Sequence, residues 1–103
     1  MRSLRIHLLY AVPDTTAGKL DYLTVTWTDS VDPNAVSNNI YRSTVSGGFY
    51  VKIANVPNGV QVYNDYAVSP GVTYYYVLTE VNNTGAESGF SVEQSAKAPG
   101  GPS

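Results

Sequence analysis

Residues 70–82 read PGVTYYYVLTEVN, and this stretch decides the fold. It opens on a turn signal, because Pro70 presets one backbone angle and Gly71 accepts an angle that other residues avoid. The aromatic and β-branched residues that follow are typical of a β-strand. Alternate side chains of a strand point to opposite faces, and both faces carry bulky residues here. We therefore expect a central strand, covered on one face and partly covered on the other, that ends at the polar turn 82–85.

The rest of the chain alternates short strands with turns. Residues 23–28 (LTVTWT) alternate apolar residues with threonine, which indicates a half-buried strand. Residues 29–37 are polar and contain a proline, and we expect a loop there. Further strands are expected at 4–12, 40–44, 49–56, 60–66 and 90–98. Together these seven predicted strands, with no helical period between them, indicate an all-β antiparallel sandwich or barrel.

Composition limits the classes of function. With 103 residues the chain suits one domain with one core, and 43% hydrophobic against 14% charged residues indicates a folded chain. A net charge of -2 provides no electrostatic footprint for nucleic acid. No apolar run approaches the roughly 18 residues of a membrane span. Because there is no cysteine, disulfides and thiolate chemistry are excluded.

Several short sequence words, taken in order, resemble the fibronectin type III domain of the bacterial and phage-encoded kind. They include LTVTW at 23–27, IYRST at 40–44, VYND at 62–65, PGVTYYYV at 70–77 and GAES at 85–88. The resemblance covers about residues 10–98. It implies a seven-stranded, immunoglobulin-like β-sandwich with Greek-key connections. One sheet would hold the first, second and fifth strands, and the other would hold the fourth, third, sixth and seventh.

The resemblance also implies structural roles for particular residues. Trp27 would be the core tryptophan of the second strand. Tyr74 would be the tyrosine-corner residue, whose hydroxyl bonds to backbone a few positions upstream. The residues expected to build the core and the turn are Leu23, Val25, Trp27, Ile40, Tyr74, Tyr76, Pro70 and Gly71.

Three features depart from the family pattern. Glu80 stands where a small apolar residue usually faces inward, so it must either reach water or have a bonded partner. Asn38 stands where an apolar residue usually begins the third strand. The chain also begins earlier than the family requires, and we expect residues 1–7 to be an arm, 8–98 the domain and 99–103 a linker-like tail.

Nothing in the sequence indicates catalysis, a metal or a cofactor. His7 is the one histidine, and no second ligand is spaced to help it hold a metal. Asp29 and Asp32 flank one loop and could bind a weak Ca²⁺, but turn formation explains them as well. The serines lack a histidine and carboxylate set to activate them. We therefore expect a protein that is not an enzyme.

Nine tyrosines are more than one small core needs, which indicates a contact surface. Our first choice is the outer face of the larger sheet, with the arm as a second element. The candidate contact residues are Tyr41, Tyr50, Tyr75 and Val77 on that face, with Leu4 and Ile6 on the arm.

The primary hypothesis is a non-catalytic structural or interaction module of a phage or virus particle, as a head decoration, tail or fibre component on the virion surface. Its partners would be other protein subunits, and host-surface glycans would be weaker contacts. The alternative is an accessory spacer or binding module of a secreted bacterial carbohydrate-active enzyme or surface protein, which would be extracellular. Two further hypotheses have less support. An engineered binder is disfavoured because the loops look natural, and an enzyme is disfavoured because the carboxylates are scattered.

Overall fold

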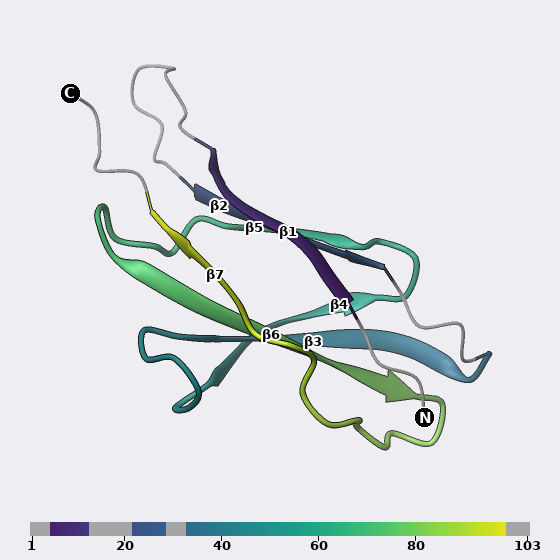
Figure 1. Ribbon diagram of the computed structural model, residues 1–103. Helices are drawn as coiled ribbons and strands as arrows, with labels where there is room; N and C mark the ends of the chain where they lie inside the picture. The colour runs from purple at the N-terminus through teal and green to yellow at the C-terminus, as the bar shows by residue number, and fades with distance from the viewer. Residues whose placement is uncertain (1–4, 13–21, 29–32, 99–103) are drawn as a thin grey trace.

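A computed structural model describes residues 5–12, 22–28 and 33–98, with side chains from Tyr22 onward. The chain forms two β-sheets packed face to face (Figure 1). The strands are β1 (Arg5–Val12), β2 (Tyr22–Thr28), β3 (Ala35–Ser43), β4 (Val51–Pro57), β5 (Val62–Asp65), β6 (Thr73–Asn82) and β7 (Gln94–Lys97).

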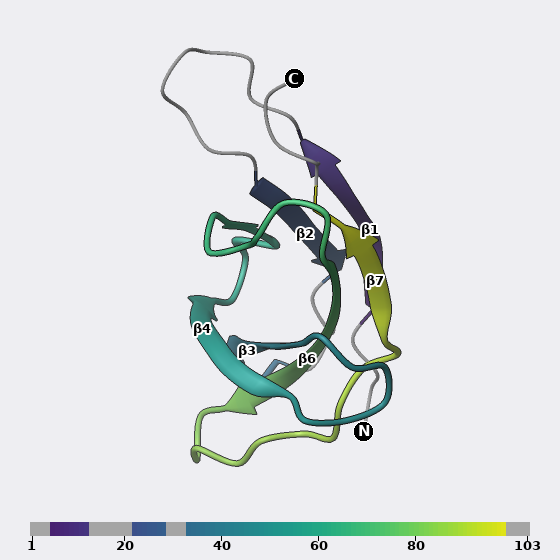
Figure 2. The same cartoon turned by 90° about the vertical axis from the view of Figure 1, so that its left-hand side faces the viewer.

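The smaller sheet has the order β1-β2-β5 and the larger sheet the order β4-β3-β6-β7. Every neighbouring pair is antiparallel. Figure 2 shows β7 running alongside β1, where the two sheets meet. The all-β prediction and the two antiparallel sheets are confirmed. The described residues contain no helix, and so none that could cross a membrane.

The largest errors in the predicted boundaries are at the starts of β3 and β7. β3 begins at Ala35, although residues 29–37 were expected to be a loop. Its polar first half is strand because it pairs with β4 on one side and β6 on the other. β7 begins only at Gln94, although a strand was expected from 90. Residues 86–93 follow β6 irregularly, held by bonds such as Ser91 N to Leu78 O at 2.8 Å.

The core lies between the sheets and takes the apolar residues that alternate along β2 and β6. Its buried members are Leu23, Val25, Trp27, Ile40, Val56, Tyr74, Tyr76, Leu78 and Ala98. β6 is buried on both faces over most of its length, which is more cover than its sequence predicted. It is therefore the central strand of the larger sheet in burial as well as in position.

A polar cluster, which we call the Asp65 clasp, joins the sheets at the end of β5. It consists of Asp65, Arg42, Tyr76 and Ala67. Nη1 of Arg42 on β3 donates to both carboxylate oxygens of Asp65, at 3.0 and 2.8 Å. The Tyr76 hydroxyl on β6 donates at 2.7 Å, and Ala67 N donates at 3.0 Å. Burial, and then the neighbouring carboxylate, raise the pKa of Tyr76, so its hydroxyl stays a donor.

The crossover 66–72 carries the chain from one sheet to the other beside this clasp. Ser69 N donates to the Tyr74 hydroxyl at 2.8 Å, which is the geometry of a tyrosine corner. Gly71 has φ +80, a conformation that side-chain-bearing residues avoid. The Arg42 guanidinium lies 5.2 Å from the centre of the Tyr74 ring. The turn, the ring and the ion pair therefore fix the crossover together.

Glu80 and Asn38, two of the departures from the family pattern, are cross-strand partners. Both are buried, with 5% and 1% of their surface exposed. Asn38 Nδ2 donates to Thr79 O at 3.3 Å, but among the described residues Asn38 Oδ1 and Glu80 Oε1 have no hydrogen-bond partner. Two residues paired across β3 and β6 thus each carry a buried acceptor without a donor, which is a costly arrangement.

Replacing Glu80 with glutamine should therefore stabilise the protein. The new amide would place a donor beside Asn38 Oδ1, and a net hydrogen bond is worth about 1 kcal/mol. We expect the Tm to rise by about 5 °C in calorimetry. Glu80→Ala is the matched control, since it removes the carboxylate without supplying a donor. A Tm for Glu80→Gln at or below that of the parent would contradict this account.

Removing the carboxylate of Asp65 should be strongly destabilising. Asp65→Ala leaves the Arg42 charge and the Tyr76 hydroxyl without their acceptor, at a cost of roughly 3 kcal/mol. Denaturant unfolding would measure it. Asn64→Ala, next along β5, removes only the acceptor of the Thr24 hydroxyl and should cost no more than about 1 kcal/mol. Equal losses in the two variants would show that the clasp has no special role.

Candidate functional site

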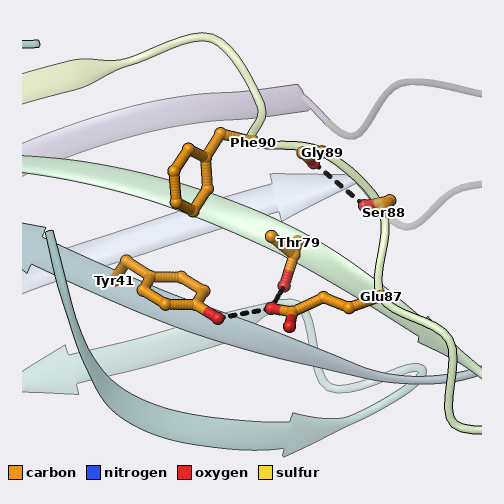
Figure 3. A pocket seen from close by; sticks show the side chains of 6 residues that line it. All are labelled: Tyr41, Thr79, Glu87, Ser88, Gly89 and Phe90. Carbon is orange, nitrogen blue, oxygen red and sulfur yellow. Dashed lines mark hydrogen bonds between the residues drawn. The ribbon is translucent and has the colours of Figure 1, made fainter. Parts of the chain in front are cut away.

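The outer face of the larger sheet carries the most developed polar and aromatic cluster among the described side chains. β3 contributes Asn39 and Tyr41, and β6 contributes Thr79, because odd-numbered residues of both strands point away from the core. The irregular segment 86–93 runs beside β6 and places Glu87 and Phe90 over this face (Figure 3). We call this set, together with Tyr50, the outer-face cluster.

Glu87 is the hub of this cluster. Its Oε2 accepts hydrogen bonds from Thr79 Oγ1 at 2.5 Å, from Asn39 Nδ2 at 3.0 Å and from the Tyr41 hydroxyl. The bonds from Thr79, Tyr41 and Asn39, with a smaller effect of Lys52, lower the pKa of Glu87. In return, its carboxylate raises the pKa of Tyr41. The side chain is therefore ionised at neutral pH and held in one place.

A second carboxylate, Glu93, ties the β3–β4 hairpin to the segment before β7. It accepts bonds from Ser46 Oγ at 2.6 Å, from Gly47 N at 2.7 Å and from the Tyr50 hydroxyl. Gly47 has φ +83, which lets the hairpin tip turn its N–H toward the carboxylate. The donors, Ser46 first, lower the pKa of Glu93, and Glu93 raises that of Tyr50. The hairpin tip is thus fixed relative to the outer-face cluster.

Three aromatic rings meet between the two carboxylates. The centroid of the Phe90 ring lies 5.1 Å from that of Tyr41 and 5.2 Å from that of Tyr50, and both pairs are T-shaped. Such edge-to-face pairs are favourable geometries for aromatic rings. The Phe90 side chain nevertheless stays 55% exposed. The ring is therefore held by its two tyrosine neighbours, while more than half of its surface meets solvent.

An open hollow of about 280 Å³ lies beside these rings. Its lining is shown in Figure 3 and consists of Tyr41, Thr79, Glu87, Ser88, Gly89 and Phe90. The lining therefore combines an aromatic wall with hydroxyls and an ionised carboxylate. Its chemistry suits a ligand that offers hydrogen-bond donors together with an apolar flank.

The structure brings together only some of the predicted contact residues. Tyr41 and Tyr50 belong to the outer-face cluster, and Tyr75 is half-buried on the same face of β6. Val77 is only 2% exposed, so its assignment to a contact surface was wrong. It pairs with Tyr41 in register, beneath the region where Phe90 packs, and is covered.

The arm residues are placed less fully. Leu4 lies outside the described residues, and Ile6 is described by its backbone alone, paired with Trp27. The arm, the tail and their boundaries stay predictions. Leu23, Val25, Trp27, Ile40, Tyr74 and Tyr76 lie in the core, and Pro70 and Gly71 lie in the crossover.

Sequence reasoning missed Glu87, Phe90 and Glu93 as site residues. Glu87 lies in an irregular stretch, where sequence alternation does not indicate a face. Phe90 was expected in a regular strand, but β7 begins only at Gln94, so alternation did not indicate its face either. One signal was available, a large aromatic residue directly after Gly89 in a turn-rich stretch. Among the side chains that the structure describes, no three acidic or histidine residues gather as a metal site.

The fold defines an immunoglobulin-like β-sandwich module, and the outer face of its larger sheet carries a polar and aromatic cluster. No family model matches the sequence. The chain is 37% identical to an Fn3-like protein from Clostridium thermocellum, with 88% of each chain covered and a TM-score of 0.68. The protein therefore belongs to the fibronectin type III-like family, as its sequence words indicated.

Two curated relatives are much longer proteins, of which the chain spans only a small part. It is 49% identical over 80 residues to an amylopullulanase of Thermoanaerobacter thermohydrosulfuricus, which is 77% of this chain and 5% of that protein. It is 38% identical over 76 residues to an amylopullulanase of Thermoanaerobacterium saccharolyticum, 74% of this chain and 6% of that one. The chain thus matches a small segment of each enzyme, and it is a non-catalytic Fn3-like domain.

These relatives bear on the two functional hypotheses differently. They are named as enzymes, so they give no support to the phage or virus particle or to the virion surface. They favour the alternative, in which the chain is an accessory part of a carbohydrate-active enzyme.

The outer-face cluster should contribute stability that depends on pH. The pKa of Glu87 is below its ordinary 4.5 in the folded protein, so the stabilisation is complete above about pH 4.5 and disappears as the pH falls through the folded value. Since Glu87 is exposed, we expect Glu87→Gln to lose only about 1 kcal/mol at pH 7. Thermal unfolding between pH 7 and 2.5 should show the two proteins converge in acid, and a constant difference would contradict it.

Proposed function

We propose that the chain is an accessory module of a larger, secreted bacterial enzyme that acts on a polysaccharide. The observation that carries the proposal is the 49% identity to a segment that makes up 5% of an amylopullulanase. In this role the module does no chemistry. It spaces or holds other parts of the enzyme, and its protein partners are the domains that flank it.

The direction of the strands supports an in-line spacer. β1 begins at Arg5, opposite Thr28 of β2, whereas β7 ends at Lys97, opposite Thr73 of β6. These positions lie at opposite ends of the sandwich (Figure 1). A chain that enters at one end and leaves at the other keeps its neighbours apart by the length of the module. We further propose that the complete domain has the seven-stranded Greek-key topology of its family.

An extracellular or cell-surface location follows from the same proposal, since polymeric substrates stay outside the cell. The absence of cysteine is compatible with it, because the stability here comes from the core and the Asp65 clasp. The outer-face cluster is then free to meet either a neighbouring domain or the substrate.

The complete gene tests this proposal. We expect one long reading frame in which this chain is a small part and a polysaccharide-degrading domain precedes or follows it. The 103-residue chain alone should release no reducing sugar from pullulan or starch above the buffer background. A short reading frame that ends with this module, among genes for particle proteins, would overturn the proposal and restore the phage hypothesis.

A further inference from the structure

The outer-face cluster has properties that a purely structural cluster does not need. Glu87 Oε2 accepts three bonds, but within the described part of the chain no hydrogen bond reaches its other oxygen, Oε1. An ionised, immobilised carboxylate with an open acceptor thus lines the hollow. An acceptor held in this way binds a donor with less loss of side-chain entropy than a mobile one would.

The aromatic wall of the hollow is equally fixed. Tyr41 and Tyr50 both form T-shaped pairs with Phe90, and the hydroxyl of each tyrosine is bonded to a carboxylate. Phe90 remains 55% exposed. Exposed aromatic side chains that are already ordered are favourable contact residues, since little freedom remains to be lost on binding.

The charged groups of the outer face limit the class of ligand that can bind there. Glu87 and Glu93 are both ionised, and Lys52 is the basic side chain that acts on Glu87. Lys97, paired with Thr73, lies on the same face, so the described outer face has no net charge that would attract an anion. The ionised Glu87 at the hollow itself disfavours nucleic acid and acidic polysaccharides there. A neutral sugar has no such penalty. Its hydroxyls donate to a carboxylate, and the C–H flank of its ring packs on an aromatic surface.

We propose that the hollow formed by Tyr41, Thr79, Glu87, Ser88 and Phe90 binds a neutral glucan chain, with Phe90 as the stacking platform and Glu87 as the hydroxyl acceptor. This rests on the proposed function, because an accessory module of a polysaccharide-degrading enzyme meets such chains. The binding is weak, roughly millimolar, since a shallow open hollow covers only a ring or two. Weak sites still matter when they are tethered to a catalytic domain that holds the same polymer.

The test is an NMR titration of the 103-residue chain with maltohexaose. We expect amide shifts confined to residues 39–41, 79 and 87–90. Phe90→Ala and Glu87→Gln should each weaken binding by about tenfold, because each removes one of the two main contacts. Phe90→Leu keeps apolar volume but not the ring, and it should also weaken binding if Phe90→Ala disturbs the fold.

Tyr66→Ala is the matched control. The exposed fraction of Tyr66, 53%, is similar to that of Phe90. Its ring, however, packs on Tyr22 at the crossover, away from the outer face. This variant should bind maltohexaose like the parent. Tetragalacturonate, which is acidic, should produce no shifts in any of the proteins.

Three results would overturn the glucan site: no shifts with maltohexaose, shifts that survive the Phe90 and Glu87 changes, or stronger binding of tetragalacturonate. None of them bears on the reading frame that tests the proposed function. Conversely, glucan binding by a chain from a short phage gene would refute the enzyme-module proposal and keep the site. The two proposals can therefore fail separately.

Discussion

The contact between Asp65 and Arg42 is the constraint on which the arrangement of the sheets depends. Apolar packing holds two sheets together but is non-directional, so it fixes their relative position weakly. Here Arg42 reaches from the larger sheet to a carboxylate of the smaller one at 2.8 Å, and Tyr76 adds a bond at 2.7 Å. These bonds have geometric requirements that packing lacks. They fix the sheets where the chain crosses between them, and the tyrosine corner holds that crossing from the other side.

The core could be predicted from the sequence because it obeys simple periodicity. Val25 and Trp27 alternate with threonine, and Tyr74 follows a Pro-Gly turn at the spacing of the family. Asp65 accepts one local bond, from Ala67 N two residues further on, but its other bonds come from distant strands. Such long-range partners leave no local signal. The early start of β3 was not predicted for a related reason. Its first residues are polar, and they form a strand only because both neighbouring strands pair with them.

The sequence predicted which face of the larger sheet carries the cluster, but not all of the residues that form it. Alternation assigned Tyr41 correctly to that face, and it assigned Val77 there too, where the side chain is in fact covered. What alternation could not provide was the irregular segment 86–93, whose route is set by bonds from Ser88 and Ser91 to β6. That route brings Glu87 and Phe90 over the sheet. Sites built by irregular segments beside regular strands lie beyond any periodic reading.

The clasp and the outer-face cluster share strands but not faces. On β3, Arg42 points inward to Asp65, and its neighbour Tyr41 points outward to Glu87. A slip of one residue in the pairing of β3 would exchange the two and place a guanidinium outside and a tyrosine in the clasp. The clasp therefore fixes the register that creates the outer face. Because the cluster's own bonds lie on the solvent side, its side chains can be changed without touching the inward contacts that hold the sandwich together.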